Sequence, residues 1–306
     1  MQNNQSRVSV LMNCYNGEKY LREALDSIYA QSYDNWEIIF IDNCSIDSSA
    51  KIAQSYDSKL KYYKTEGNIP LGAARNFGLE FCQGKYAAFL DVDDIWLPDA
   101  LVRLVCAISS GNYALAYGGQ IDIDSEGNQT GQYIPSSKSD YLFGDLLLQF
   151  DIPIVASIID INKMVESELS FDGNIFASEE YCLYMQVAAR YEICSIPSII
   201  VKYRILSNSL TAKTSHLWAK ERVYTLNKII QKFPNISLKY KKQFIEAYAR
   251  ADYYKVQHMM EIGCRCKAIA LSSKHAYRSF KYFAIFICTL FPKVLWKKIQ
   301  KIKYKR

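Results

Sequence analysis

Three short apolar segments in the first ninety residues constrain the fold more than any other feature of the sequence. Between them, apolar residues recur at helical spacing and predict helices over Tyr20–Ala30 and Leu71–Phe81. Strands that alternate with helices predict βαβ units and a mostly parallel sheet, with helices covering both faces. The three segments, which we predict as buried strands, are Val8–Met12, Trp36–Ile41 and Tyr86–Leu90.

Polar residues follow each of the three predicted strands. In an open parallel sheet, ligands bind beyond the carboxyl ends of the strands, where loops gather polar groups. We therefore expect one site built from three loops: Asn13–Gly17 after the first strand, Asp42 and Asn43 after the second, and Asp91–Asp94 after the third.

The pattern after Asp94 is less regular. Pro98 suits the first turn of a helix, and Ser178 suits the N-cap of another. The elements predicted there are a helix over Leu97–Ser109, a hairpin around Asp124–Asn128, a helix over Glu179–Arg190 and a strand over Ile193–Ile205 interrupted at Pro197.

The distribution of charge divides the chain into two parts. Residues 212–306 contain 22 Lys and Arg against four acidic residues, a formal charge of +18. The remaining 15 basic and 27 acidic residues give residues 1–211 a charge of −12. Because such asymmetry predicts units with different partners, we expect an α/β domain over residues 1–211 and a basic helical region over residues 212–306.

Cysteine and histidine usage excludes several classes of site. The nine cysteines form no CxxC pair, and the first residues lack the apolar core of a signal peptide, so we expect reduced thiols in the cytoplasm. All three histidines lie in the last third of the chain. A histidine-centred zinc site or a Ser-His-Asp triad in the first two thirds is therefore excluded.

The tetrad Asp91-Val92-Asp93-Asp94 is the sharpest chemical feature. Carboxylates one residue apart at a strand end can present oxygens to a hard divalent cation such as Mg²⁺ or Mn²⁺, which neutralises a diphosphate. Such a cation stabilises the negative charge on a departing nucleotide. The alternative is a solvated turn or a helix cap.

Seven segments of the chain together form a recognisable series: Val8–Asn16, Glu18–Tyr33, Trp36–Ser48, Gly67–Gly78, Gly84–Leu101, Glu179–Leu183 and Tyr203–Thr211. In order and spacing they resemble glycosyltransferase family 2 and its GT-A fold, a mixed, mostly parallel sheet between helices. The resemblance covers roughly residues 6–211 and implies transfer of a sugar from a nucleotide-diphospho-sugar.

The resemblance implies that the first two loops hold the nucleoside. Cys14, Tyr15 and Asn16 lie where the family's first loop cradles the base and ribose. Asp42 corresponds to the acid that accepts a hydrogen bond from the uracil imide. The alternatives are simple packing for Tyr15 and a strand-end turn for Asp42.

The same resemblance implies donor and metal contacts farther along the chain. Arg75 would lie beside the nucleotide and pair with the Asp91 cluster, or form an ordinary structural salt bridge. Asp91 and Val92 would contact the donor, and Asp93 would be the principal ligand of Mn²⁺ or Mg²⁺, with Asp91 beside it. Arg204 would pair with phosphate oxygens.

The family's acidic pair at the start of a helix reads Glu179-Glu180 in this sequence. By position, Glu180 replaces the usual Asp as the base that deprotonates the acceptor hydroxyl, and Glu179 positions the acceptor. The alternative is that acids in a first helical turn complement the helix dipole. The resemblance implies an inverting single displacement.

The implied donor is a UDP-sugar, with dTDP- and GDP-sugars as alternatives, and the implied acceptor is a glycan or lipid-linked oligosaccharide of a bacterial surface polysaccharide such as O-antigen, lipopolysaccharide or capsule. A catalytically inactive nucleotide-sugar-binding scaffold stays open as an alternative. A sugar-phosphate nucleotidyltransferase would need a glycine-rich phosphate loop, but Asn13–Lys19 contains Gly17 alone. A dinucleotide-dependent dehydrogenase is disfavoured because no GxGxxG motif occurs.

The end of the chain suggests contact with a membrane surface. Tyr282–Phe291 is apolar but too short to span a bilayer, and Lys293–Arg306 adds seven basic residues and no acid. Together they predict an interfacial helix on anionic lipid at the cytoplasmic face of the cell membrane. The alternative is a core helix with a solvated end. Nucleic-acid binding is disfavoured because no recognition motif accompanies the charge.

Overall fold

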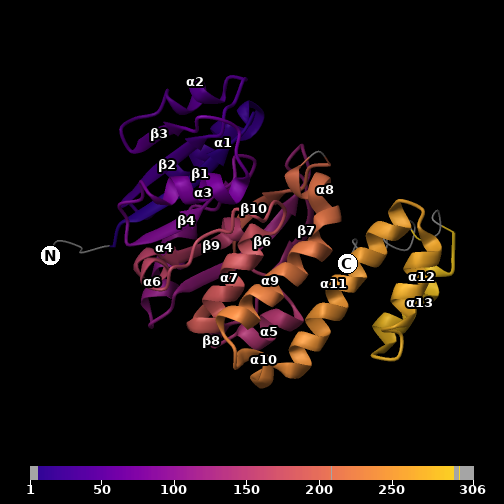
Figure 1. The fold of residues 1–306 in the computed structure, drawn as a ribbon. Coiled ribbons are helices and arrows are strands. Elements are labelled where there is room, and N and C mark those ends of the chain that lie inside the picture. The colour runs from indigo at the N-terminus through magenta and orange to yellow at the C-terminus, as the bar shows by residue number, and fades with distance from the viewer. Residues whose placement is uncertain (1–5, 208, 293–295, 297–306) are drawn as a thin grey trace. The chain divides into compact units, whose positions relative to one another are not determined.

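The computed structural model describes residues 6–207, 209–292 and 296, and it divides the chain into two compact units, Met1–Leu206 and Ser207–Arg306 (Figure 1). The first unit holds a ten-stranded sheet, and the second is built from helices. The division lies close to the change of charge that follows residue 211.

Parallel strands form the first half of the sheet, in the order β3, β2, β1, β4. β1, β2 and β4 are the three apolar segments of the sequence, and every residue in them is buried, which confirms their prediction as buried strands. β3 lies at the sheet edge and has no apolar run that would predict it. These strands are β1 (Val8–Cys14), β2 (Trp36–Asp42), β3 (Leu60–Lys64) and β4 (Tyr86–Phe89).

Mixed pairing continues the sheet beyond β4 in the order β9, β6, β10, β5. β9 is antiparallel to both neighbours, whereas β6 and β10 are parallel. The predicted hairpin is present as β6 and β7, and β10 is one strand whose register shifts between Ser195 and Ile199, around Pro197. These strands are β5 (Ile95–Trp96), β6 (Leu115–Ile123), β7 (Gln129–Tyr133), β8 (Lys138–Asp140), β9 (Ser157–Asp160) and β10 (Ile193–Arg204).

Helix α4 begins later than the sequence predicts. It starts at Ala100, because Ile95–Trp96 and the Leu97 N–H pair with β10 and keep the chain extended before Pro98. The helices of this unit are α1 (Glu18–Tyr29), α2 (Ser49–Ala53), α3 (Leu71–Leu79), α4 (Ala100–Ser109), α5 (Phe143–Leu148), α6 (Ile161–Glu166) and α7 (Glu179–Arg190), with a 3₁₀ turn at Ile154–Ala156.

Helices cover both faces of the parallel strands. On one face, alternate residues of β1 pack into a core with apolar residues of α1 and α4. On the other face, α3 lies over β1 and β2 (Figure 1). A Cβ atom on Gly78 would lie 2.2 Å from Leu11 Cδ1 and 2.9 Å from Ile41 Cγ1, so α3 approaches the sheet more closely than a larger residue would allow. This close approach sets the position of Arg75, about one helical turn earlier.

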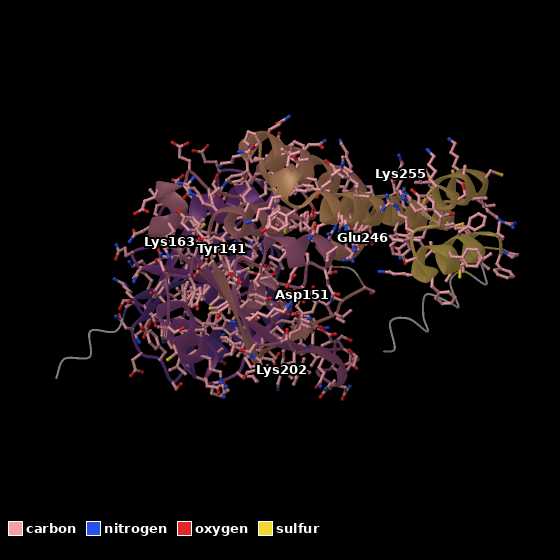
Figure 2. The ribbon with its side chains drawn as sticks, turned by 90° about the horizontal axis from the view of Figure 1, so that it is seen from below. Tyr141, Asp151, Lys163, Lys202, Glu246 and Lys255 are labelled. Carbon is pink, nitrogen blue, oxygen red and sulfur yellow. The ribbon has the colours of Figure 1, made fainter. Side chains whose placement is uncertain are left out.

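The second unit is built around the long helix α11, against which α9 and α12 pack. The hydroxyl of Tyr282 on α13 donates to Glu246 Oε1 of α11 at 2.6 Å, while Lys255 on α11 is exposed (Figure 2). In the described part of the chain, no helix is long and apolar enough to cross a membrane. The helices are α8 (Leu210–Thr214), α9 (Trp218–Lys232), α10 (Ile236–Lys239), α11 (Lys241–Glu261), α12 (Arg265–Ser273) and α13 (Phe280–Thr289), with a 3₁₀ turn at Ser215–Leu217.

Candidate active site

The loops at the carboxyl ends of β1 and β2 hold each other in place. Asn16 has a left-handed backbone with a φ of 55°, a conformation that asparagine adopts more readily than most residues. Its side-chain oxygen accepts from the Ile46 N–H at 2.9 Å, and its own N–H donates to Ser45 Oγ at 3.1 Å. The adjoining Tyr15 side chain is 55% exposed, so its ring is accessible to a ligand over an ordered backbone.

Asp42 is held at the end of β2 by two hydrogen bonds. The residue is fully buried, its Oδ1 accepts from the Ser45 N–H at 2.7 Å, and its Oδ2 accepts from the Tyr62 hydroxyl at 2.5 Å. Burial, together with this carboxylate, raises the pKa of Tyr62, which keeps the hydroxyl protonated as the donor. Through these two hydrogen bonds Asp42 orders the loop that follows β2.

Asn43, the next residue, fastens the start of α3 to the end of β2. Its side-chain amide donates to the Ile69 carbonyl at 2.7 Å and accepts from the Ile69 N–H at 2.9 Å. This paired contact brings the first turn of α3 to the carboxyl edge of the sheet, where Arg75 meets the third loop.

The third loop, Asp91–Asp94, is a tight turn between β4 and β5. The Asp94 N–H donates to the Asp91 carbonyl at 3.2 Å. Val92 packs against the first loop, since a Cβ atom on Gly17 would lie 2.8 Å from Val92 Cγ2 and 3.1 Å from Cys14 Sγ. Burial raises the pKa of Cys14, which keeps its thiol neutral. Cys14 and Val92 therefore both pack around Gly17, and no larger residue would fit between these two loops.

The turn concentrates negative charge. Burial, with the nearby charge of Asp91, raises the pKa of Asp93 to about 6. Burial and the charges of Asp93 and Asp91 also raise the pKa of Asp94. Asp94 Oδ1 accepts from the Arg204 N–H at 2.7 Å, whereas its Oδ2 is buried without a hydrogen-bond partner. Burial and mutual repulsion thus make the charged forms of Asp93 and Asp94 unfavourable, and a cation beside them would offset this cost.

The donor set also suits a hard cation that is shared with a ligand. Among the described residues, no group of three or more His, Cys, Asp or Glu side chains is arranged to hold a metal ion by itself. Mg²⁺ in nucleotide sites is commonly held by one or two carboxylates together with the phosphates of the ligand. Asp91 and Asp93 supply two such carboxylates, so these residues fit a cation completed by a diphosphate.

Arg75 joins the third loop to the start of α7. Its guanidinium is buried, and it donates to Asp91 Oδ1 at 3.1 Å and to Glu179 Oε1 at 2.5 Å. Burial opposes the charged form, but the charges of Asp91 and Glu179 outweigh it and raise the pKa of Arg75. The predicted pairing of Arg75 with the Asp91 cluster is therefore present, and the same cation also holds one of the two acids of α7.

Helix α3 packs closely against α7 and the segment that precedes it. Asn76, next to Arg75, donates to the carbonyl of Phe171, in that preceding segment, at 2.8 Å and accepts from its N–H at 2.9 Å. A Cβ atom on Gly72 would lie 3.3 Å from Glu179 Cβ. Glu179 is buried, whereas Glu180 is partly exposed. Of the two acids, Glu180 is therefore the one that an acceptor can reach more readily.

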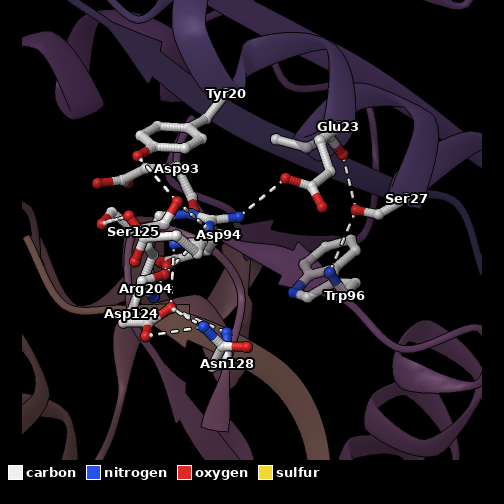
Figure 3. Close-up of polar contacts among 12 residues, drawn as sticks. Tyr20, Glu23, Ser27, Asp93, Asp94, Trp96, Asp124, Ser125, Asn128 and Arg204 are labelled. Atoms are coloured by element: carbon white, nitrogen blue, oxygen red, sulfur yellow. Dashed lines mark hydrogen bonds and ion pairs between the residues drawn. The ribbon is translucent and has the colours of Figure 1, made fainter. Parts of the chain in front are cut away.

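Arg204 lies behind the third loop and binds the protein with all three guanidinium nitrogens (Figure 3). Direct pairing with phosphate, which the resemblance implied, would require it to exchange these partners. Its acceptors are the Asp93 carbonyl at 3.0 Å, the Asp124 and Ser125 carbonyls at 3.1 and 3.4 Å, and Glu23 Oε2 at 2.8 Å.

Sequence reasoning did not identify the two residues of α1 that contact Arg204. Glu23 forms the ion pair, and the Tyr20 ring lies 4.3 Å from the guanidinium carbon. Tyr20 and Glu23 lie one turn apart on α1. Polar residues at this spacing are common on the solvent-facing side of a helix, so the pattern did not mark them as part of a site. Because Arg204 is 181 positions beyond Glu23, no local pattern could have connected them.

The sequence is similar to those of known glycosyltransferases. The sequence profile described as Glycosyl transferase family 2 matches residues 9–165. An uncharacterized glycosyltransferase of Rickettsia felis is 29% identical over 67% of this chain and 34% of its own length, so this chain spans about a third of that relative. An Escherichia coli protein named UDP-Glc:alpha-D-GlcNAc-diphosphoundecaprenol beta-1,3-glucosyltransferase WfgD is 27% identical over 67% of this chain and 79% of its own length.

Solved structures agree on the fold. The crystal structure of S. aureus TarS residues 1–349 in complex with UDP-GlcNAc superposes with a TM-score of 0.58 at 16% identity, covering 96% of this chain and 92% of that chain. At this identity the likeness concerns the fold. It confirms the predicted α/β GT-A architecture with a helical C-terminal region.

Proposed function

The chain belongs to glycosyl transferase family 2 and is a glycosyltransferase, and we propose that it moves a sugar from a UDP-sugar to a hydroxyl of a glycan or lipid-linked oligosaccharide. One observation carries this proposal. Arg75 binds both Asp91 in the acidic turn and Glu179 at the start of α7. The buried guanidinium of this one residue therefore joins the proposed donor side of the site to the proposed acceptor side.

The names of relatives support the donor and the pathway. The Escherichia coli relative is named for UDP-glucose and for an acceptor linked to diphosphoundecaprenol, and the TarS crystal contains UDP-GlcNAc. We extend the uridine nucleotide and the polyprenyl diphosphate acceptor to this chain as a proposal. The place of this reaction would be the assembly of a bacterial surface polysaccharide.

In this proposal Asp93, with Asp91 beside it, would hold the Mn²⁺ or Mg²⁺ that accompanies the diphosphate of the donor. The cation, when bound, stabilises the negative charge that develops on the leaving diphosphate. Arg75 holds the Asp91 carboxylate in place through the contact with its Oδ1 at 3.1 Å. Tyr15 offers its exposed ring to the nucleoside, and Val92 packs against the loop that carries Tyr15.

The acceptor side is built on the first turn of α7. Glu180 is the proposed base: it takes the proton of the acceptor hydroxyl as the oxygen attacks the anomeric carbon and the nucleoside diphosphate departs, which inverts the configuration. Glu179, held by Arg75, fixes the direction of this turn. The partial exposure of Glu180 and the burial of Glu179 support this division of roles.

The proposal is tested by measuring UDP release from a panel of UDP-sugars in the presence of Mn²⁺, with and without N-acetylglucosamine on a polyprenyl diphosphate. We expect release from one donor that depends on both the acceptor and the cation. Donor binding without any release would favour the inactive scaffold. Formation of pyrophosphate from a sugar phosphate and UTP would favour a nucleotidyltransferase.

We also propose that the second unit holds the enzyme at the cytoplasmic face of the membrane. Helix α13 has one packed side, with Tyr282 and Thr289 buried. The opposite side is apolar and unusually exposed, with Phe280 at 85%. Its residues recur at helical spacing and form what we call the α13 stripe: Phe280, Phe283, Ile287 and Leu290.

Charge supports an anionic lipid surface as the partner of the α13 stripe. Residues 212–306 carry a formal charge of +18, and the exposed Lys274 and Lys281 lie beside the stripe in sequence. The basic segment Lys293–Arg306, on which the sequence prediction also drew, lies outside the described residues apart from Trp296. An apolar face with basic residues beside it suits the interfacial layer of a bilayer.

Replacing Phe280 and Phe283 with serine is expected to lower binding of the full chain to vesicles of phosphatidylcholine and phosphatidylglycerol by at least about tenfold, because each buried phenylalanine contributes about 1.5–3 kcal/mol. Flotation measures the bound fraction. Leu238→Ser, at an exposed apolar position on α10, is the matched control and should bind like the parent chain. Equal binding of the double variant and the parent would contradict the role of the stripe.

A further inference from the structure

We infer that Arg204 is a positioning residue for the acidic turn, and that Glu23 and Tyr20 of α1 set its direction. The inference rests on the proposed function, in which Asp91 and Asp93 of that turn hold a divalent cation. It assigns to Arg204 a role through the protein, in place of the phosphate contact that sequence resemblance implied.

Arg204 holds two consecutive residues of the turn through different groups. Its backbone N–H donates to Asp94 Oδ1 at 2.7 Å, and its Nε donates to the Asp93 carbonyl at 3.0 Å. These two bonds fix the peptide group between Asp93 and Asp94 and the side chain of Asp94. The direction in which the Asp93 carboxylate leaves the backbone is therefore determined largely by Arg204.

The far side of the guanidinium is fixed by two other elements (Figure 3). One nitrogen donates to the Asp124 and Ser125 carbonyls in the turn between β6 and β7, and another donates to Glu23 Oε2 at 2.8 Å. The Tyr20 hydroxyl donates to the same Ser125 carbonyl at 3.3 Å. Arg204 thus joins α1, the β6–β7 turn and the acidic turn at one point.

The geometry requires the planar fork of arginine. Each of the three guanidinium nitrogens, Nε, Nη1 and Nη2, donates to a different part of the protein. A lysine ammonium is a compact charge and cannot reach acceptors in all three directions. Arg204 is buried, whereas the Glu23 side chain is 56% exposed. The two ends of this ion pair can therefore be altered separately, one with a strong effect on the turn and one with a weak effect.

Arg204→Lys is expected to weaken Mn²⁺ binding about tenfold or more, because loss of a residue that orients metal ligands typically costs 10–100-fold in metal affinity. Glu23→Gln is expected to weaken it about two- to fivefold, since a half-exposed ion pair contributes little. Free Mn²⁺ is measured by electron paramagnetic resonance in the presence of UDP, well below the unfolding temperature of each variant. This readout does not depend on turnover.

Arg103→Lys is the matched control. Arg103 forms an exposed ion pair with Asp99 on α4 and lies outside the site, so Mn²⁺ affinity is expected to change less than about twofold. Should Arg204→Lys fail to fold, Glu23→Gln and Tyr20→Phe, which alter the exposed end and a single hydroxyl, carry the test. An Mn²⁺ affinity unchanged in the folded variants would overturn the inference.

Asp93→Asn separates this inference from the proposed function. If Asp93→Asn abolishes Mn²⁺ binding while the Arg204 and Glu23 variants bind like the parent, the positioning role is wrong and the proposed function stands. If Asp93→Asn binds Mn²⁺ like the parent, the turn is not the metal site, and the proposed function loses its metal ligand. Graded loss across Glu23→Gln, Arg204→Lys and Asp93→Asn supports both.

Discussion

Asp93→Asn is expected to lower the rate of sugar transfer about a thousandfold, because a cation at the leaving diphosphate supplies several kcal/mol of transition-state stabilisation. The amide keeps the shape of the side chain but removes the charge that holds the cation. Burial already raises the pKa of Asp93 to about 6, so the ionised form is unfavourable in the folded chain. The neutral variant should therefore unfold at the same temperature as the parent or higher.

The measurement is the initial rate of UDP release as a function of Mn²⁺ concentration, with a thermal unfolding curve for each protein. Asp34→Asn, at an exposed position between α1 and β2, controls for loss of one negative charge. A variant at Asp93 that keeps more than about a tenth of the parent rate would remove Asp93 from the metal site, since this loss would be under about 1.4 kcal/mol.

The parallel half of the fold follows from local patterns in the sequence. Val8–Met12, Trp36–Ile41 and Tyr86–Leu90 are buried on both faces, so their continuous apolar character is required by the sheet itself. Two edge strands lack this signal. β3, at the edge of the parallel half, is partly exposed, and β5, at the far edge of the sheet, is two residues long, so neither has a run of apolar residues that sequence reasoning can detect.

The candidate site divides in the same way. Its loops could be predicted, because each polar group follows a strand directly. Its partners could not, since Arg75 and Glu179 are 104 positions apart, and Arg204 and Glu23 are 181 apart. Arg75 makes the expected pair with Asp91, but its second partner, Glu179, was not expected, and Arg204 contacts protein groups where the resemblance implied phosphate. For Asp42, the sequence predicts the position at the end of a strand but not the hydrogen bond from Tyr62 of the neighbouring strand.

One physical problem links the two arginines. The site brings together Asp91, Asp93, Asp94, Glu179 and Glu180, and unpaired buried carboxylates tend to take up protons. Arg75 contacts Asp91 and Glu179 through their carboxylates. Arg204 contacts the turn from behind, with its backbone N–H on Asp94 Oδ1 and its Nε on the Asp93 carbonyl. Asp93 has neither arginine as a direct side-chain partner in the described contacts, and burial with the charge of Asp91 raises its pKa to about 6.

The second large effect on activity is expected from a substitution on the acceptor side of the site. Glu180→Gln is expected to lower kcat about a hundredfold to ten-thousandfold, the usual contribution of a general base. Binding of UDP with Mn²⁺ should change less than about twofold, because the variant leaves Arg75 and the acidic turn intact. Steady-state rates with saturating acceptor, together with calorimetric titration of UDP, measure the two quantities separately.

Three further variants make the assignment specific. Glu180→Asp should retain more activity than Glu180→Gln, because a shorter carboxylate can still accept the proton, whereas an amide cannot. Glu179→Gln breaks a contact of the buried Arg75 and should also weaken UDP binding, which Glu180→Gln does not. Glu166→Gln, exposed at the end of α6, should leave both quantities unchanged. If Glu180→Gln transfers sugar as fast as Glu180→Asp, the proton leaves by another route and Glu180 is not the base.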